Sequence, residues 1–373
     1  MLTRVDRYML SQFLWLFGFF ALILVAIFWI NRAVSLFDRL IGDGQSALVF
    51  LEFSTLALPR LIITVLPIAT FAASVYVTNR LNNESELTVM MATGRSPWRL
   101  ARPVLVFGLI SALMMSALSH VLVPAAQARL SEREADIAQN VTARLLTEGS
   151  FLSPISGVTF YTREIGEDGV LNDVFLADRR IDSQRMIYTA TQAYLVRQGD
   201  QTTLIMIDGL AQRYDGRNQR LSTGKFQDFS FDISSLVRKD QSLGTNIREI
   251  GTIEMIRDSA AVAAGTSASR GEIAEELHER FARPLFCIVT ALIGFATLLV
   301  GGYSRFGVWR EVVVAFGLLI LIDGLRGALS GAVLTDAANW FFMYIPSALG
   351  FFLAFLLLAS ASRPGWWKRR TIA

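Results

Sequence analysis

Cysteine, histidine and charge are all scarce in this chain of 373 residues. The single cysteine, Cys287, lies in an apolar stretch, so no intrachain disulfide is expected and redox chemistry is disfavoured. The two histidines do not make a zinc-protease motif, because His278-Glu279 would require a third ligand at position 282, where the chain has Ala282. We therefore predict no metal site and no catalytic site.

A nucleotide-binding loop is also missing. Gly224-Lys225 is followed by Phe226, and the first glycine that a P-loop would need is replaced by Gln219. We therefore expect no cofactor, and any ATP that is used must be hydrolysed by another chain. The net charge of +3 gives no case for nucleic-acid binding.

What the chain does have is apolar sequence in long blocks. Hydrophobic residues make up 53% of the chain and charged residues 18%, against a globular norm of about 25% charged. Each block is long enough to cross the roughly 30 Å apolar layer of a bilayer. We predict six transmembrane helices, at about 10–36, 52–79, 103–125, 280–301, 308–332 and 340–361.

Between the third and fourth spans the pattern changes to that of strands. Residues 127–146 predict a polar helix, 149–233 alternate as β-strands do, and 238–270 are interpreted as a linker. Asp-Gly pairs at 168–169, 208–209 and 215–216 predict turns. Short strands at this spacing favour a sandwich or jelly roll. The fold class is therefore an α+β membrane protein, with domains at 1–127, 128–270 and 271–373.

Arginines set the predicted orientation in the membrane. Six spans place both termini on one side, together with the arginines of segment 80–102 and the basic tail 363–370. The positive-inside rule assigns that side to the cytoplasm, so the β-rich insert is expected to be extracytoplasmic.

A short polar segment separates the second and third spans. Asn83 is a candidate N-cap with Glu86 as its capping-box partner, and Gly94 is a natural helix end. We name residues 84–94 the coupling segment. One hypothesis is a helix that lies among the lipid headgroups. The other is a lever that docks on a basic cytosolic partner through Glu84, Glu86, Leu87, Met90, Met91 and Gly94.

The fifth span contains an acidic and a basic residue one turn apart, Asp323 and Arg326. They either neutralise each other or form an anion site in which Asp323 orients Arg326, with Arg32 and Arg39 of the first span joining them. A guanidinium matches a phosphate through two hydrogen bonds, so phosphate is the anion we would expect.

Glycines line the same span. Gly317, Gly324 and Gly331 recur every seven residues, and Gly327 with Gly331 forms a G-x-x-x-G pair. Such a stripe permits close approach of another helix, either within the chain or from a second subunit.

Two stretches carry a family resemblance. E-S-E-L-T-V-M-M-A-T-G at 84–94 followed by S-P-W-R, and L-H-E-R-F-A-R-P-L at 277–285, resemble the lipopolysaccharide-export permeases of the LptF/LptG type, in a form nearer to LptF. The resemblance implies a bacterial inner-membrane permease subunit with a periplasmic β-jelly roll. It also implies several partners: an LptG-type paralogue across a lateral gate, a dimeric LptB-type ATPase at the coupling segment, and bridge proteins of the LptC and LptA type.

Two other functions remain open on the residues alone. One is a permease of an ABC transporter for another lipid or a lipoprotein. The other is a membrane protein that transmits force or regulates without moving a substrate.

Overall fold

The computed structural model describes residues 3–42, 47–141, 148–155, 157–166, 169–181, 184–198, 201–216, 220–232, 246–266, 268–301 and 309–362. Contacts divide the chain into a helical unit, Met1–Leu130 with Thr245–Ala373, and a β unit, Ser131–Gly244. The basic tail 363–370 lies outside the described residues.

The helical unit confirms the predicted spans and lengthens most of them. Six helical stretches in the described part are long and apolar enough to cross a membrane. The helices are α1 (Arg4–Gly42), α2 (Ala47–Asn83), α3 (Glu86–Ala92), α4 (Pro97–Ala117), η1 (Leu118–Leu122, a π-helical turn), α5 (Val123–Val141), α9 (Arg270–Gly301), α10 (Trp309–Thr335), η4 (Ala337–Tyr344) and α11 (Ile345–Ala361).

Helix α9 is the centre of this unit. In its most apolar window 78% of the residues are buried, against 11% in α1 and 17% in α10, so α9 packs inside the bundle while α1 and α10 present open faces. Helix α2 lies close against it, because the Ser74 hydroxyl donates to the Ala291 carbonyl at 2.6 Å. On α4, a Cβ at Gly108 would lie 3.1 Å from the Ile288 Cα, so glycine there allows close contact with α9.

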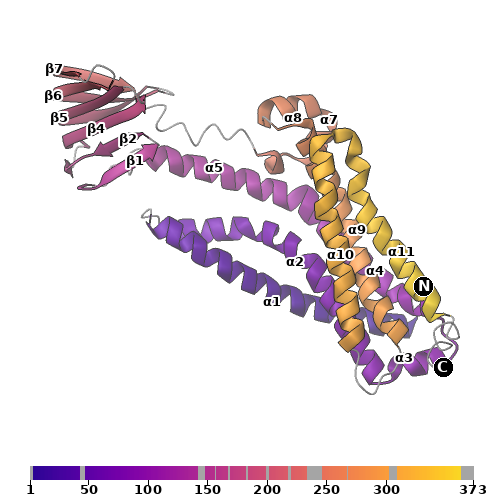
Figure 1. Ribbon diagram of the computed structural model, residues 1–373. Coiled ribbons are helices and arrows are strands. Elements are labelled where there is room, and N and C mark those ends of the chain that lie inside the picture. Colours follow the sequence, from indigo (N-terminus) through magenta and orange to yellow (C-terminus); the bar gives the residue numbers. More distant parts are fainter. Residues whose placement is uncertain are drawn as a thin grey trace. The chain divides into compact units, whose positions relative to one another are not determined.

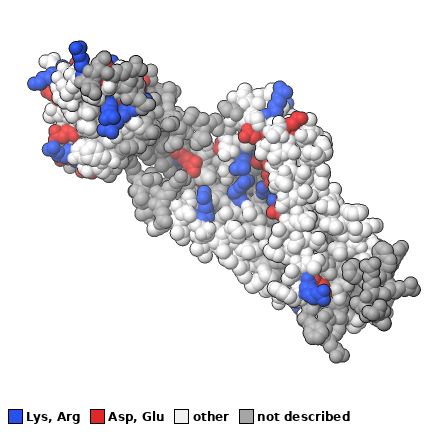
Figure 2. Space-filling model, viewed as in Figure 1, with Lys and Arg blue, Asp and Glu red and all other residues white. Residues whose placement is uncertain are grey.

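The two ends of the bundle carry different short helices. Helix α1 begins and α11 ends at the end that carries α3, whereas α7 (Thr252–Arg257) and α8 (Ser259–Thr266) lie at the opposite end of α9 (Figure 1). Toward the α7 and α8 end, Figure 2 shows atoms of Arg, Lys, Asp and Glu gathered on a surface that is otherwise largely uncharged in this view.

The predicted linker 238–270 is wrong over its second half. Residues 246–266 form η3 (Ile247–Glu249), α7 (Thr252–Arg257) and α8 (Ser259–Thr266). Polar side chains start these turns: Asn246 accepts from the Arg248 N–H at 3.1 Å, and Asp258 accepts from the Ala261 N–H at 3.0 Å. Residues 259–269, near the end of the predicted linker, are rich in alanine, which is the best helix former.

The β unit is one antiparallel sheet. It contains β1 (Phe151–Ile155), β2 (Val158–Tyr161), β3 (Glu164–Ile165), β4 (Leu171–Ile181), β5 (Gln184–Gln198), β6 (Gln201–Asp215) and β7 (Arg220–Asp232). Neighbouring strands run in the order β1-β2-β4-β5-β6-β7, with β3 on β4. This order follows the chain, so the described strands confirm an antiparallel β unit but not the Greek-key connections of a jelly roll.

In one row of residues that crosses β4, β5 and β6, the alternation of inward-facing and outward-facing side chains is interrupted. Asp173, Thr191 and Asp208 lie side by side in β4, β5 and β6, and both aspartates have positive φ, of 52° and 48°. The predicted turn at Asp208-Gly209 is therefore wrong, because both residues lie inside β6. Gly209 is needed for space rather than for a turn, since a Cβ there would collide with the ring of Phe226.

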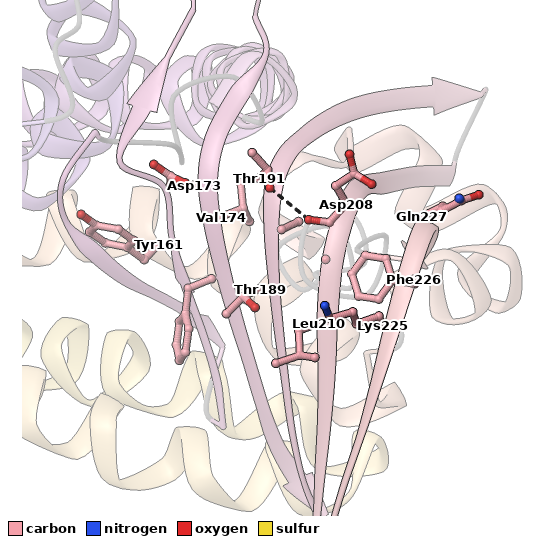
Figure 3. Close-up of a pocket in the computed structure, with 13 residues that line it drawn as sticks. Tyr161, Asp173, Val174, Thr189, Thr191, Asp208, Leu210, Lys225, Phe226 and Gln227 are labelled. Carbon is pink, nitrogen blue, oxygen red and sulfur yellow. Dashed lines mark hydrogen bonds between the residues drawn. The ribbon is translucent and has the colours of Figure 1, made fainter.

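A hollow of about 760 Å³ opens at this row (Figure 3). The Thr191 hydroxyl bridges two strands there by donating to the Asp208 carbonyl at 3.1 Å. The lining mixes the carboxylates of Asp173 and Asp208 and the ammonium of Lys225 with aromatic and aliphatic side chains, and it therefore offers no single kind of chemistry.

Candidate functional site

A group of charged side chains occupies the α7 and α8 end of the bundle. Helix α9 supplies Glu279 and Arg283, one turn apart and just before its apolar run begins at Pro284. The Arg283 guanidinium donates twice to the Glu279 carboxylate, at 2.7 and 3.0 Å, and both side chains are largely buried. This pair forms the base of the group.

Two further arginines approach the same carboxylate from other helices. Glu279 interacts electrostatically with Arg326 of α10 and with Arg60 of α2, besides its α9 partner. Arg60 is half-buried, and among the described residues it makes no ion pair. We name Arg60, Glu279, Arg283, Asp323 and Arg326 the charged cluster. Its three guanidinium groups outnumber its two carboxylates by one, and Arg248 and Glu276, which also interact electrostatically with Arg60, add one charge of each sign.

The predicted contact between Asp323 and Arg326 is present. Their charged atoms lie 2.8 Å apart, with 25% of the arginine side chain and 51% of the aspartate side chain exposed. The guanidinium also lies over the ring of Phe286, 5.4 Å from its centroid, and makes a cation–π contact there. Asp323 therefore neutralises Arg326 in part and orients it at the same time. Whether an anion joins them stays a prediction.

The predicted anion site also included two arginines of the first span, Arg32 and Arg39. Arg32 is exposed on α1. The side chain of Arg39 lies outside the described residues. Their predicted contribution to an anion site stays a prediction.

A second buried network lies beside the charged cluster. It holds residues 247–257, with which the chain returns from the β unit; we name them the return segment. The Arg280 guanidinium donates to Glu276 at 3.0 Å, to the Ile250 carbonyl at 2.9 Å and to the Thr252 hydroxyl at 3.0 Å. Thr252 also contacts His120 of η1, at 3.1 Å. Arg280 thus joins the return segment to α9, next to the point where the chain leaves the bundle.

At the opposite end, the coupling segment forms helix α3 and a tight turn. Gly94, with φ of +86°, closes the helix: its N–H donates to the Met91 carbonyl at 3.0 Å, and the Arg95 N–H donates to the Met90 carbonyl at 3.4 Å. This pair of bonds is a Schellman motif, so the predicted helix end at Gly94 is confirmed. The following helix, α4, is capped by Ser96, whose side chain accepts from the Arg99 N–H.

The predicted start of the coupling-segment helix, α3, is wrong. Asn83 is the last residue of α2, and its side-chain amide donates to Asn79 on the preceding turn. Helix α3 starts instead after Ser85, which has positive φ and makes no side-chain cap. Helix α2 continues past its apolar residues as far as Asn83. Because Asn83 is itself helical, it cannot act as the N-cap of a capping box.

The apolar stripe of α3 faces the chain's own bundle. Leu87 is fully buried in the core of the helical unit, and Met90 and Met91 pack partly against it. Glu86 is half-buried and accepts from the Tyr8 hydroxyl at 3.3 Å, while Glu84 pairs with Arg80. The apolar side of α3 therefore packs on the chain's own helices and is not available to a partner. The surface left for a partner is more polar than predicted.

Comparison with known proteins decides the family. Residues 7–360 match the family described as lipopolysaccharide export system permease LptF/LptG. The chain belongs to the LptF/LptG permease family. It is 22% identical over 304 residues to an uncharacterised protein of Rickettsia prowazekii, which covers 81% of this chain and 83% of that protein. The LptF permease of Escherichia coli K12 is 23% identical over 213 residues, 56% of this chain and 57% of that protein.

Family membership makes the chain a multi-pass lipopolysaccharide-export permease component rather than an enzyme. The resemblance of the coupling segment and of 277–285 to this family is thereby confirmed, and so are the six apolar helices expected for it. The finer assignments, to a particular subunit and particular partners, are taken up as proposals below.

In this permease the glycine stripe of α10 faces outward. A Cβ added to Gly317, Gly324, Gly327 or Gly331 would meet no atom within 4 Å. The hypothesis that the stripe packs within the chain is therefore disfavoured, and the stripe is free to receive another helix.

Sequence reasoning missed Arg60 and the roles of Glu279 and Arg283. A lone arginine inside an apolar span is a functional candidate by default, and that rule alone could have found Arg60. The two α9 residues were in view only as part of a family motif. Their charges stand next to each other on one helix, and only the fold shows that α2 and α10 bring more cations to them.

Proposed function

We propose that this chain is the LptF-type permease subunit of an ABC transporter that extracts lipopolysaccharide from a bacterial inner membrane. It pairs with an LptG-type paralogue, and a dimeric LptB-type ATPase supplies the energy. The cargo then passes to periplasmic bridge proteins of the LptC and LptA type. The family match over residues 7–360 supports the transported substrate class.

The charged cluster is the observation that carries the site. Arg326 lies 17 residues after the start of α10, which corresponds to about 25 Å of helix from the cytoplasmic end. On α9, Glu279 and Arg283 precede the apolar run. The cluster therefore belongs at the extracytoplasmic edge of the apolar layer, at the depth of the phosphates on a lipid A headgroup. Arg60 is the cation left to meet one of them.

A guanidinium at this depth is worth more than one in water. A phosphate that leaves water for a lower dielectric needs a nearby cation, and the cluster provides a surplus of one. The two carboxylates keep Arg283 and Arg326 oriented while the site is empty. Arg326 and Arg60 come from different helices, so a bound phosphate would link α10 to α2.

The open faces of α1 and α10 supply the proposed lateral gate. The glycine stripe of α10 allows a helix of the paralogue to approach closely. On entry, the cargo passes between the two permease subunits. In the β unit, Tyr188, Leu204 and Met206 form an apolar interior, bordered by the partly buried Phe229 and Phe231, where acyl chains are sheltered.

The test is the amount of lipopolysaccharide that copurifies with the assembled complex. Arg60→Ala and Arg326→Ala should each weaken its retention by about 1–3 kcal/mol, the cost of one charge-assisted contact. Arg326→Lys should restore only part, because a point charge replaces a fork. Arg310→Ala is the matched control, since this exposed residue lies at the other end of the same helix. Equal lipid content in all variants would refute the site.

A further inference from the structure

Helix α7 exposes two large apolar side chains. Ile253 is 82% exposed and Ile256 61% exposed, and they lie three residues apart on one side of the helix. We infer that α7 is an interfacial helix that buries Ile253 and Ile256 in the extracytoplasmic surface of the lipid bilayer and so fixes the returning chain there. The inference rests on the membrane placement of α9 and is independent of which cargo is carried.

The other side of α7 is held firmly by the bundle. Thr252 and Met255 are buried, and Ile250 just before the helix is buried as well. The Arg280 guanidinium donates to the Ile250 carbonyl and to the Thr252 hydroxyl. Because this inner side is fixed, the outward direction of the two isoleucines is fixed with it, and they cannot turn inward to escape water.

The position of α7 along α9 gives its depth. Arg280 precedes Pro284, where the apolar run begins, by four residues or about 6 Å of helix. An aromatic marker lies at the same level: Trp340 stacks on His278, with ring centroids 4.8 Å apart, and is 46% exposed. Indole rings concentrate where apolar core and headgroups meet. One turn of α9 thus has an interfacial tryptophan beside it and α7 attached to it.

The chemistry of α7 fits a lipid surface at this depth. Its sequence, T-I-E-M-I-R, is too short to span and alternates apolar side chains with Glu254 and Arg257, which are exposed and can reach the headgroups. In water, two isoleucines exposed to this extent on one helix side would be unfavourable. Partial burial at the boundary of acyl chains and headgroups removes that penalty without desolvating the charges.

Depth-dependent quenching in nanodiscs made only of phospholipid tests this inference. The full chain, with Cys287→Ala, carries one new cysteine at Ile253, Ile256 or Glu254, labelled with a polarity-sensitive fluorophore. We expect blue-shifted emission at 253 and 256 and loss of intensity when lipids carry a spin label at a shallow acyl position. Position 254 is the matched control on the same helix and should be quenched by aqueous iodide instead.

Two outcomes of the quenching experiment would overturn the inference. If iodide quenches 253 and 256 as strongly as 254, the helix faces water. If 253 and 256 are shielded from iodide but insensitive to the lipid quencher, protein covers them. A second measurement avoids the substitutions: a photoreactive phospholipid should crosslink to residues 252–257 of the unaltered chain, and absence of such crosslinks would count equally against it. Because no lipopolysaccharide is present, failure here would leave the proposed transport function untouched.

Discussion

Replacing Arg280 by methionine should release the return segment from α9 without unfolding the bundle. The Arg280 side chain is only 4% exposed, and its guanidinium donates to a carboxylate on its own helix, to a carbonyl before α7 and to a hydroxyl within α7. Methionine fills similar volume but offers no donor. The Ile250 carbonyl and the Glu276 carboxylate would then be left without this partner, next to apolar neighbours.

The size of the effect follows from these contacts. Removing one partner of a buried ion pair costs about 3–5 kcal/mol, because the remaining charge stays desolvated. Glu276 keeps a second cation, since Arg248 lies 3.5 Å away and is half-exposed, so we place the loss near the lower limit, at about 3 kcal/mol. Expressed as an equilibrium for local opening of residues 247–257, that is about a hundredfold.

Hydrogen–deuterium exchange of the full chain in nanodiscs measures this opening directly. Peptides from 247–257 should lose about two orders of magnitude in protection in Arg280→Met, while peptides from the apolar half of α9 keep theirs. Arg283→Met is the matched control: it lies one turn further along α9, and its ion pair stays within the helix. Arg280→Lys should recover only part of the protection. Unchanged protection in Arg280→Met, or full recovery with lysine, would refute the reasoning.

Three further predictions concern the coupling segment, the glycine stripe of α10 and the β unit. Glu84→Ala with Glu86→Ala should release the ATPase in detergent pull-downs and leave bound lipid unchanged; full ATPase recovery would favour a helix that only lies among headgroups. Gly324→Leu should leave this chain folded but block copurification of the paralogue, and an intact heterodimer would exclude this seam. The bonds from Arg180 hold the pKa of Asp178 below its usual value, so their contribution to stability is lost as pH falls through that lowered pKa. Asp178→Asn should therefore flatten the acid dependence of sheet stability, measured by pulse proteolysis of the full chain, and an unchanged dependence would contradict this.

The apolar helices could be predicted from the sequence because the bilayer imposes one simple requirement. A span must hold enough consecutive apolar residues to cross about 30 Å, and this is a local property that no tertiary contact overrides. Boundaries were less predictable for the same reason. Helix α2 continues to Asn83 and α9 begins at Arg270, because a helix does not end where its apolar residues end.

The β unit shows where local signals fail. Asp-Gly is a strong turn signal, yet Asp208-Gly209 lies within a strand. No local sequence feature distinguishes an Asp-Gly pair in a turn from this pair within a strand. Asp208 takes the left-handed conformation that a turn would also require. Gly209 has no side chain and so leaves space for the ring of Phe226 on the next strand. That contact joins residues 17 positions apart and exists only once the sheet has formed.

The charged cluster extends this point to function. Along the sequence, Arg60 is an isolated charge, Glu279 and Arg283 satisfy each other, and Asp323 and Arg326 satisfy each other, so each can be explained without a ligand. The fold brings the five together, so that three guanidinium groups share two carboxylates, while Arg248 and Glu276 beside Arg60 add one charge of each sign. A surplus cation at the edge of an apolar layer is unfavourable in an empty site and favourable when a phosphate is present. It is therefore this surplus, which no single pair reveals, that argues for an anionic cargo.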